Sequence, residues 1–131
     1  MFSRLFAPRV TAHAHCDLPC GVYDPAQARI EAESVKGTQE KYQANEDADF
    51  RVRALIIKEQ RAEAVKHHLS VLWSDYFKAP HFEKYPELHQ LFNDALKAAS
   101  ATKASTDPKT GEKLLELIAQ IDTIFWETKK A

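Results

Sequence analysis

Apolar side chains recur at intervals of three and four residues through most of the chain after residue 24. This spacing places them on one face of an α-helix. The clearest stripe follows an i, i+3, i+4, i+7 pattern near the C-terminus and comprises Leu114, Leu117, Ile118, Ile121, Ile124 and Phe125. Together with a high content of Ala, Leu, Glu, Lys and Gln, the pattern predicts an all-α protein.

Proline and polar residues divide this pattern into four predicted helices. The first begins at Asp24-Pro25, where Asp serves as an N-cap and Pro takes the first helical position, and the last begins at a second Asp-Pro pair, Asp107-Pro108. The first three cover residues 26–43, 50–77 and 86–101. Four helices with short connections predict an antiparallel up-and-down four-helix bundle. Apolar positions expected to pack are Ile30, Val35 and Tyr42 in the first helix, and Leu55, Ile56, Val65, Leu69, Leu72, Trp73 and Tyr76 in the second.

Length and charge restrict the possible functions. A chain of 131 residues is long enough for one domain with a single core. Its formal charge is −1, and would be −3 without Arg4 and Arg9, so we expect no nucleic-acid partner, which would require a basic face. No apolar run reaches the ~18 residues of a membrane span, so no membrane partner is expected. The first residues lack the ~7–15-residue apolar run of a secretory signal, which favours a cytoplasmic location.

The only two cysteines lie four positions apart, just after a small-x-small sequence, Ala12-His13-Ala14. A Cys-x3-Cys motif is ambiguous by itself, because the thiols could be buried, free or joined in a disulfide, and zinc sites usually need a second ligand pair. A cut after Ala14 would make His15 the N-terminal residue. We therefore expect residues 1–14 to be a leader removed on maturation and residues 15–131 to form a single domain with an N-terminal metal-binding hook.

A free N-terminus at His15 would provide a compact set of metal ligands. The His15 amine and the Cys16 amide nitrogen close one five-membered chelate ring, and the amide nitrogen and sulfur of Cys16 close another. The Cys20 thiolate reaches the fourth position, and the His15 imidazole remains as an axial ligand. Two nitrogens and two thiolates in a plane suit Ni(II) or Cu(II), and nickel is preferred because thiolates tend to reduce Cu(II). Anionic sulfur and amidate donors stabilise a higher oxidation state, so the ligand set predicts Ni(II)/Ni(III) cycling.

The remaining helical histidines add no evident metal site. His67 and His68 are adjacent in the second predicted helix and project about 100° apart, which makes them poor joint ligands. We expect both, like His81 and His89, to be surface or capping residues.

Residues 15–25, His-Cys-Asp-Leu-Pro-Cys-Gly-Val-Tyr-Asp-Pro, resemble the nickel hook of the nickel-containing superoxide dismutases. The resemblance continues in five further segments, residues 27–33, 57–63, 66–69, 73–77 and 124–131, and so covers essentially the whole chain. No ligand position departs from the family's pattern.

The resemblance implies an enzyme that disproportionates superoxide to dioxygen and hydrogen peroxide with one nickel ion per subunit. The metal ligands that it implies are His15, Cys16 and Cys20. Tyr23 matches the phenol that guards access to the open face of the site, and Asp17 and Pro19 match residues that shape the hook.

Glu31 and Arg61 match the pair that steadies the axial imidazole in this family. Such a role is physically reasonable, because a ligating imidazole usually donates its other ring nitrogen to a carboxylate. Glu31 is about two turns into the first predicted helix, and Arg61 could hold its carboxylate by a bidentate contact. Without the resemblance, both would be read as ordinary surface charges and Tyr23 as a packing aromatic.

The resemblance also implies a homohexamer with hooks held between subunits, a dedicated maturation peptidase, and a cytoplasmic location. Two other functions remain open at this point. The hook could store or carry nickel without turnover, or the chain could be a helical interaction module whose two cysteines form a disulfide.

Overall fold

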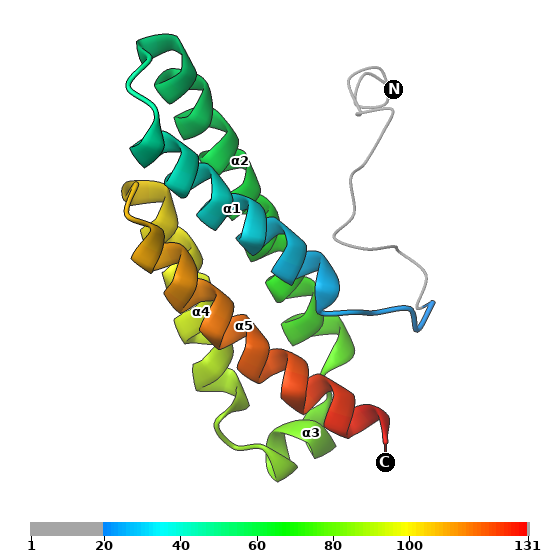
Figure 1. Cartoon of the computed structure of the whole chain (residues 1–131). Coiled ribbons are helices and arrows are strands. Elements are labelled where there is room, and N and C mark those ends of the chain that lie inside the picture. Colours follow the sequence, from blue (N-terminus) through cyan, green and yellow to red (C-terminus); the bar gives the residue numbers. More distant parts are fainter. Residues whose placement is uncertain (1–19, 131) are drawn as a thin grey trace, which may run out of the picture.

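The structure is a computed structural model that describes residues 20–130. Its elements are α1 (Ala26–Ala44), α2 (Ala48–Val71), a π-helical turn η2 (Leu72–Tyr76), α3 (Ala79–Lys84), α4 (Leu88–Ala104) and α5 (Pro108–Lys129). α1 packs against α2 and α5, and α4 packs against the same two helices, so the four long helices form a closed ring. Neighbours in this ring run in opposite directions (Figure 1), which confirms the predicted antiparallel four-helix bundle.

The core is a continuous set of aliphatic and aromatic side chains contributed by all four long helices. The largest fully buried apolar side chains are Leu69, Leu88, Phe92, Leu114, Ile118, Ile121 and Phe125. α1 contributes mainly small residues, Ala28, Ala32 and Val35, to this interior. Small side chains let α1 lie close to its neighbours, which fixes the position of its N-terminus, the end that leads to the hook.

The helices differ from the prediction in several places, and the second predicted helix ends as α2 at Val71, where η2 begins. α2 begins at Ala48 because the carboxylate of Asp47 accepts a hydrogen bond from the backbone N–H of Phe50 at 2.9 Å, an N-cap within the expected connection. α3 lies in the segment expected to be a connection between the second and third helices. α4 begins at Leu88, two residues after the proline that we expected to start it.

Three apolar side chains expected to pack lie on the surface instead. Ile30 is 55% exposed, Leu55 39% and Ile56 53%. For Leu55 and Ile56, the reason is that α2 buries a stripe made largely of small residues, which includes Ala54, Ala62 and Val65, and turns the larger aliphatic side chains outward. Within residues 20–130, no helix has both the length and the hydrophobicity that a membrane span requires.

The end of the bundle far from the hook is held by buried polar groups. Lys58 is 3% exposed, and its ammonium donates hydrogen bonds to three backbone carbonyls at the C-terminal end of α4, at 2.6, 2.7 and 2.9 Å. Burial lowers the pKa of this ammonium. Gln39 bonds one of the same carbonyls, that of Ser105, at 3.0 Å. A Cβ at Gly111 would lie 2.7 Å from the Gln39 side chain, so only glycine allows this approach of α5 to α1.

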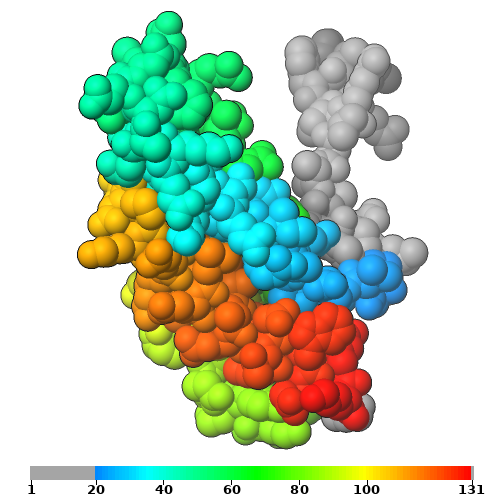
Figure 2. Space-filling model, in the orientation of Figure 1, coloured from blue at the N-terminus to red at the C-terminus, as the bar shows by residue number. Residues whose placement is uncertain are grey.

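At the opposite end, the N-terminus of α1 lies beside the C-terminus of α5. Figure 2 shows the first described residues, in blue, against the red end of α5. The segment that precedes α1 therefore leaves the bundle next to the last turn of the chain.

Candidate metal centre

The first described residues form a tight turn around a cysteine sulfur. Cys20 is exposed, and its Sγ accepts a hydrogen bond from the backbone N–H of Val22 at 3.4 Å. Gly21 has a φ of +72°, a conformation that glycine adopts without steric cost, and this turns the Val22 N–H back toward the sulfur. The local sequence thus folds Cys20 into a hook whose sulfur accepts a backbone hydrogen bond, as ligating thiolates commonly do.

This turn is joined rigidly to the bundle. The carboxylate of Asp24 accepts a hydrogen bond from the backbone N–H of Ala26 at 2.8 Å, which satisfies one of the free donors at the start of α1. Pro25 is fully buried. The ring of Tyr23 is half-buried and lies 5.5 Å from the ring of Tyr76, centroid to centroid.

Tyr76 lies next to Tyr23, and the sequence analysis did not identify it as a candidate site residue. It lies in the π-helical turn η2, a type of irregularity that is frequent at functional sites. Its ring is 4.4 Å from that of Phe125, and its hydroxyl shares a hydrogen bond of 2.7 Å with the Thr128 hydroxyl. The sequence indicated only that Tyr76 faces the core, because a contact with Tyr23, 53 positions earlier, leaves no signal in local spacing.

Glu31 and Arg61 meet across the α1–α2 seam. One terminal nitrogen of Arg61, Nη1, lies 3.1 and 3.2 Å from the two carboxylate oxygens of Glu31. The pairing agrees with the sequence prediction, but a single nitrogen serves both oxygens, so the two-nitrogen fork that we expected is absent. The Glu31 side chain is 20% exposed and that of Arg61 39%, so the carboxylate lies deeper than its partner.

His68 lies on the same face of α2 as Arg61, two turns farther toward the hook end. Burial lowers its pKa below the usual value for histidine, neighbouring His67 lowers it further, and the charge of Glu31 opposes both effects. The rings of His67 and His68 make an edge contact at 5.3 Å. The neutral form of His68 is therefore favoured in the folded protein.

The other two helical histidines accept hydrogen bonds near α3. His81 Nδ1 accepts the backbone N–H of Lys78 at 3.0 Å, which confirms a capping role. His89 Nδ1 accepts the indole N–H of Trp73, also at 3.0 Å.

Four predicted site residues, His15, Cys16, Asp17 and Pro19, lie outside the described residues. Within residues 20–130, no three His, Cys, Asp or Glu side chains gather as a metal-binding group. Cys20 is the predicted metal ligand that lies within the described residues. Tyr23, Glu31 and Arg61, which the sequence analysis assigned to the surroundings of the metal, lie there too. The thiolate of Cys20 is a ligand type that nickel accepts, so this part of the ligand set fits the expected metal.

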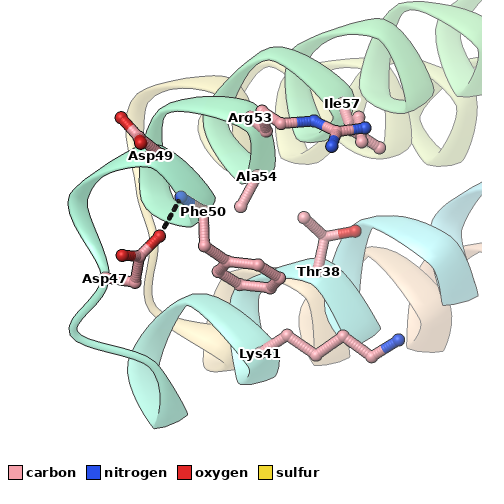
Figure 3. A pocket seen from close by; sticks show the side chains of 8 residues that line it. All are labelled: Thr38, Lys41, Asp47, Asp49, Phe50, Arg53, Ala54 and Ile57. Atoms are coloured by element: carbon pink, nitrogen blue, oxygen red, sulfur yellow. Dashed lines mark hydrogen bonds between the residues drawn. The ribbon is translucent and has the colours of Figure 1, made fainter.

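A cavity lies at the other end of α1. It has a volume of about 580 Å³ and is lined by residues of the α1–α2 corner, among them Thr38, Asp47, Phe50 and Ile57. Figure 3 shows the Phe50 ring at this corner, with the Asp47 carboxylate engaged by the Phe50 backbone N–H as the N-cap of α2. Of the two acidic side chains that line the cavity, Asp47 and Asp49, the first is thus already used for capping, and the cavity does not adjoin the hook.

Comparison with known proteins gives a consistent result. The model of the nickel-containing superoxide dismutase family matches residues 10–129. The chain is 76% identical to the nickel superoxide dismutase of Streptomyces coelicolor over 131 residues, 100% of both proteins. A native structure of nickel superoxide dismutase has a TM-score of 0.88 and 76% identity, and covers 89% of this chain and 100% of its own. An apo structure of nickel superoxide dismutase has a TM-score of 0.84 and 75% identity, and covers 85% of this chain and 100% of its own.

The lowered pKa of His68 predicts a specific pH dependence of stability. Because the unfolded chain takes up this proton at a higher pH than the folded chain does, the free energy of unfolding should fall as the pH drops below about 6.5. His68→Gln cannot be protonated and should weaken this fall between pH 7 and pH 5, measured by urea unfolding of the metal-free chain. His67→Gln removes only the smaller of the two causes that lower the pKa of His68, so it should weaken the fall less than His68→Gln does. Equal pH dependence in wild type and His68→Gln would contradict the assignment.

Proposed function

The chain belongs to the nickel-containing superoxide dismutases, and we propose that it becomes active when a cut after Ala14 frees the His15 amine at the start of the hook. The enzyme converts two superoxide anions and two protons into dioxygen and hydrogen peroxide. Bound by the hook, nickel supplies the one-electron chemistry by alternating between Ni(II) and Ni(III). Its ligands are the amine and imidazole of His15, the amide nitrogen and thiolate of Cys16, and the thiolate of Cys20.

The observation that carries this proposal is the Glu31–Arg61 ion pair. It lies seven residues along α1 from Asp24, which corresponds to roughly 10 Å of helix between the pair and the base of the hook. In the mature site, the Glu31 carboxylate would accept the second ring N–H of the His15 imidazole and fix the orientation of the ring. Arg61 holds the Glu31 side chain in place, so the imidazole would meet a carboxylate already in position.

Tyr23 controls access to the open face of the site. Its ring is held by Tyr76 at 5.5 Å, so its position is set by α2 and η2 as well as by the hook. A phenol fixed beside the site allows only small molecules to reach the reacting atoms. Its hydroxyl offers these molecules one hydrogen bond. Asp17 and Pro19 complete the hook by restricting the chain between the two cysteines.

One comparison of length supports processing. A chain that begins at His15 would be 89% of this one, the same share that the solved native structure covers with all of its residues. This agreement is consistent with a leader that is absent from the mature protein. The cut requires a maturation peptidase as a partner.

Self-association is supported by the apolar outer face of α2. Val52 is 58% exposed, Ile56 53% and Ile57 40%. Side chains of this kind, adjacent on one helix, are typical of a surface that another protein molecule covers. We assign this face to contacts within a homohexamer, the assembly implied by the family, and we place the enzyme in the cytoplasm on the same ground.

The two alternative functions lose their support. Membership in an enzyme family over essentially the whole chain argues against a nickel store and against a disulfide-linked interaction module. Both alternatives also leave the partly buried carboxylate of Glu31 and its partner Arg61 without a role.

Cys20→Ser tests the ligand set directly. Removing the thiolate should abolish nickel binding in the native geometry and reduce dismutase activity to background, while the bundle stays folded because Cys20 is exposed and precedes α1. Activity, nickel content and helical circular dichroism are measured on the chain that begins at His15. Val22→Ala, 70% exposed and still able to donate its backbone N–H to the sulfur, is the matched control and should behave like wild type. Nickel-dependent activity in Cys20→Ser would show that the hook is not the active site.

Glu31→Gln tests whether the Glu31 carboxylate holds the imidazole of His15. The amide keeps the shape of the side chain but loses its charge, and losses of this kind typically reduce activity or metal affinity by about 10–100-fold. The nitrogen splitting in the Ni(III) resonance should change at the same time. Glu33→Gln breaks a surface pair with Arg29 on the same helix, at 2.8 Å, and should leave both quantities unchanged. If Glu31→Gln and Glu33→Gln gave the same result, Glu31 would have no part in holding the imidazole.

A further inference from the structure

Two hydroxyl groups and one carbonyl form a short chain of hydrogen bonds between η2 and the last turn of α5. The hydroxyl oxygens of Tyr76 and Thr128 lie 2.7 Å apart, and the Thr128 hydroxyl donates to the backbone carbonyl of Phe125 at 2.5 Å. Both hydroxyl-bearing side chains are half-buried. A threonine in a helix can hold its hydroxyl against a carbonyl of the preceding turn in this way. The chain of bonds therefore ends at a group of fixed position.

The direction of the bond between the two hydroxyls follows from this carbonyl. A carbonyl oxygen carries no proton, so the proton in its contact with Thr128 belongs to the threonine. A hydroxyl has only one proton to donate, and Thr128 can therefore only accept at its other contact. The proton between Tyr76 and Thr128 must come from the phenol, which makes Tyr76 the donor.

This assignment decides what Tyr76 can offer to its other neighbours. With its one proton held by Thr128, the phenol oxygen has only lone pairs left, so any further group that bonds to it must be a donor. The ring is held as well, because it packs on Phe125 at 4.4 Å and lies nearly parallel to the His81 ring at 5.8 Å. The Tyr23 ring lies 5.5 Å away. Of these two neighbouring phenols, Tyr76 is thus restricted to accepting hydrogen bonds.

We propose that Thr128 is a positioning residue that divides the roles of the two phenols. By holding the Tyr76 proton, it keeps Tyr76 as an acceptor and leaves Tyr23 as the phenol that donates to small molecules. Thr128 acts through Tyr76 and makes no bond to the substrate or the metal. The proposal deepens the role of Tyr23 proposed above and rests on it.

The division of roles favours the product side of the reaction. Superoxide can only accept hydrogen bonds, whereas hydrogen peroxide, which has gained two protons, can also donate them. An acceptor at Tyr76 offers nothing to the anion, so the anion is not held by two donors at once. Binding that stabilises the substrate alone does not speed the reaction, whereas interactions that form as the oxygen atoms gain protons do.

A second threonine on α5 provides a matched control. The Thr123 hydroxyl donates to the Ala119 carbonyl at 3.0 Å, so it makes the same kind of bond to its own helix. Its side chain is exposed, and within residues 20–130 no tyrosine hydroxyl bonds to it. An effect that comes only from removing a threonine hydroxyl from α5 would appear at both positions.

The experiment compares Thr128→Val, Thr128→Ser and Thr123→Val in nickel-loaded protein that begins at His15. Valine keeps the shape of threonine but releases the Tyr76 proton. We expect Thr128→Val to lower the rate constant for superoxide by about twofold to tenfold, the range that one hydrogen bond gives. It should also strengthen inhibition by azide, an anion that only accepts hydrogen bonds, by a similar factor. Thr128→Ser should restore both quantities, and Thr123→Val should match wild type.

A double variant shows whether Thr128 acts through Tyr76. Tyr76→Phe has no phenol proton to hold, so adding Thr128→Val to it should change neither the rate constant nor the azide inhibition any further. A purely structural role of Thr128 would instead give the same loss with and without the phenol.

A measurement on the metal-free protein tests the hydrogen bond itself. The Tyr76 hydroxyl proton should give its own NMR signal at low temperature, with a nuclear Overhauser effect to the Thr128 side chain, and Thr128→Val should lose this signal. The proposal would be overturned by Thr128→Val with the wild-type rate or wild-type azide inhibition, by Thr128→Ser as slow as Thr128→Val, by equal losses in both backgrounds, or by an absent hydroxyl signal. Such results would leave the hook as the active site, because that claim depends on Cys20→Ser.

Discussion

The structure depends on how the segment before α1 is joined to the four-helix bundle. The joining point is the start of α1, where the Asp24 carboxylate accepts the Ala26 N–H at 2.8 Å and Pro25 is fully buried. Tyr23, directly before it, packs on Tyr76 of η2. These contacts fix the place at which the chain enters α1, and so the end of the bundle at which the proposed hook would lie.

In the site that we propose, the chemistry divides between the hook and the bundle. The hook would supply the atoms that bind nickel, and the bundle would supply the groups that orient and surround them. Glu31 is only 20% exposed and is held by Arg61 across the α1–α2 seam, whereas Tyr23 is held by an aromatic cluster in which Phe125 and Lys129 of α5 also take part. The helices at the hook end would thus contribute to the site by holding these side chains in position, and none of the side chains needs to bind the metal.

The sequence predicted the parts that depend on local order. The four long helices follow from the repeat of apolar residues. The hook ligands, which the sequence places within residues 15–20, stay a prediction. What it did not predict depends on contacts between distant segments. Leu55 and Ile56 fit an apolar stripe, but alanines and Lys58 take the buried positions of α2 instead. The π-helical turn that presents Tyr76 to Tyr23, and the single-nitrogen contact of Arg61 with Glu31, likewise have no signature in residue spacing.

The central claim is that the α-amine of His15 is a metal ligand, and a single retained residue tests it most directly. Two forms of the protein, one beginning at His15 and one beginning at Ala14, differ by one alanine that ties the amine into a peptide bond. Each is loaded with nickel under reducing conditions, and nickel content and dismutase activity are measured on the same samples. The form that begins at His15 should hold one nickel ion per chain and be active, whereas the form with Ala14 should bind nickel weakly and be inactive. Equal nickel content and equal activity in the two forms would contradict the account.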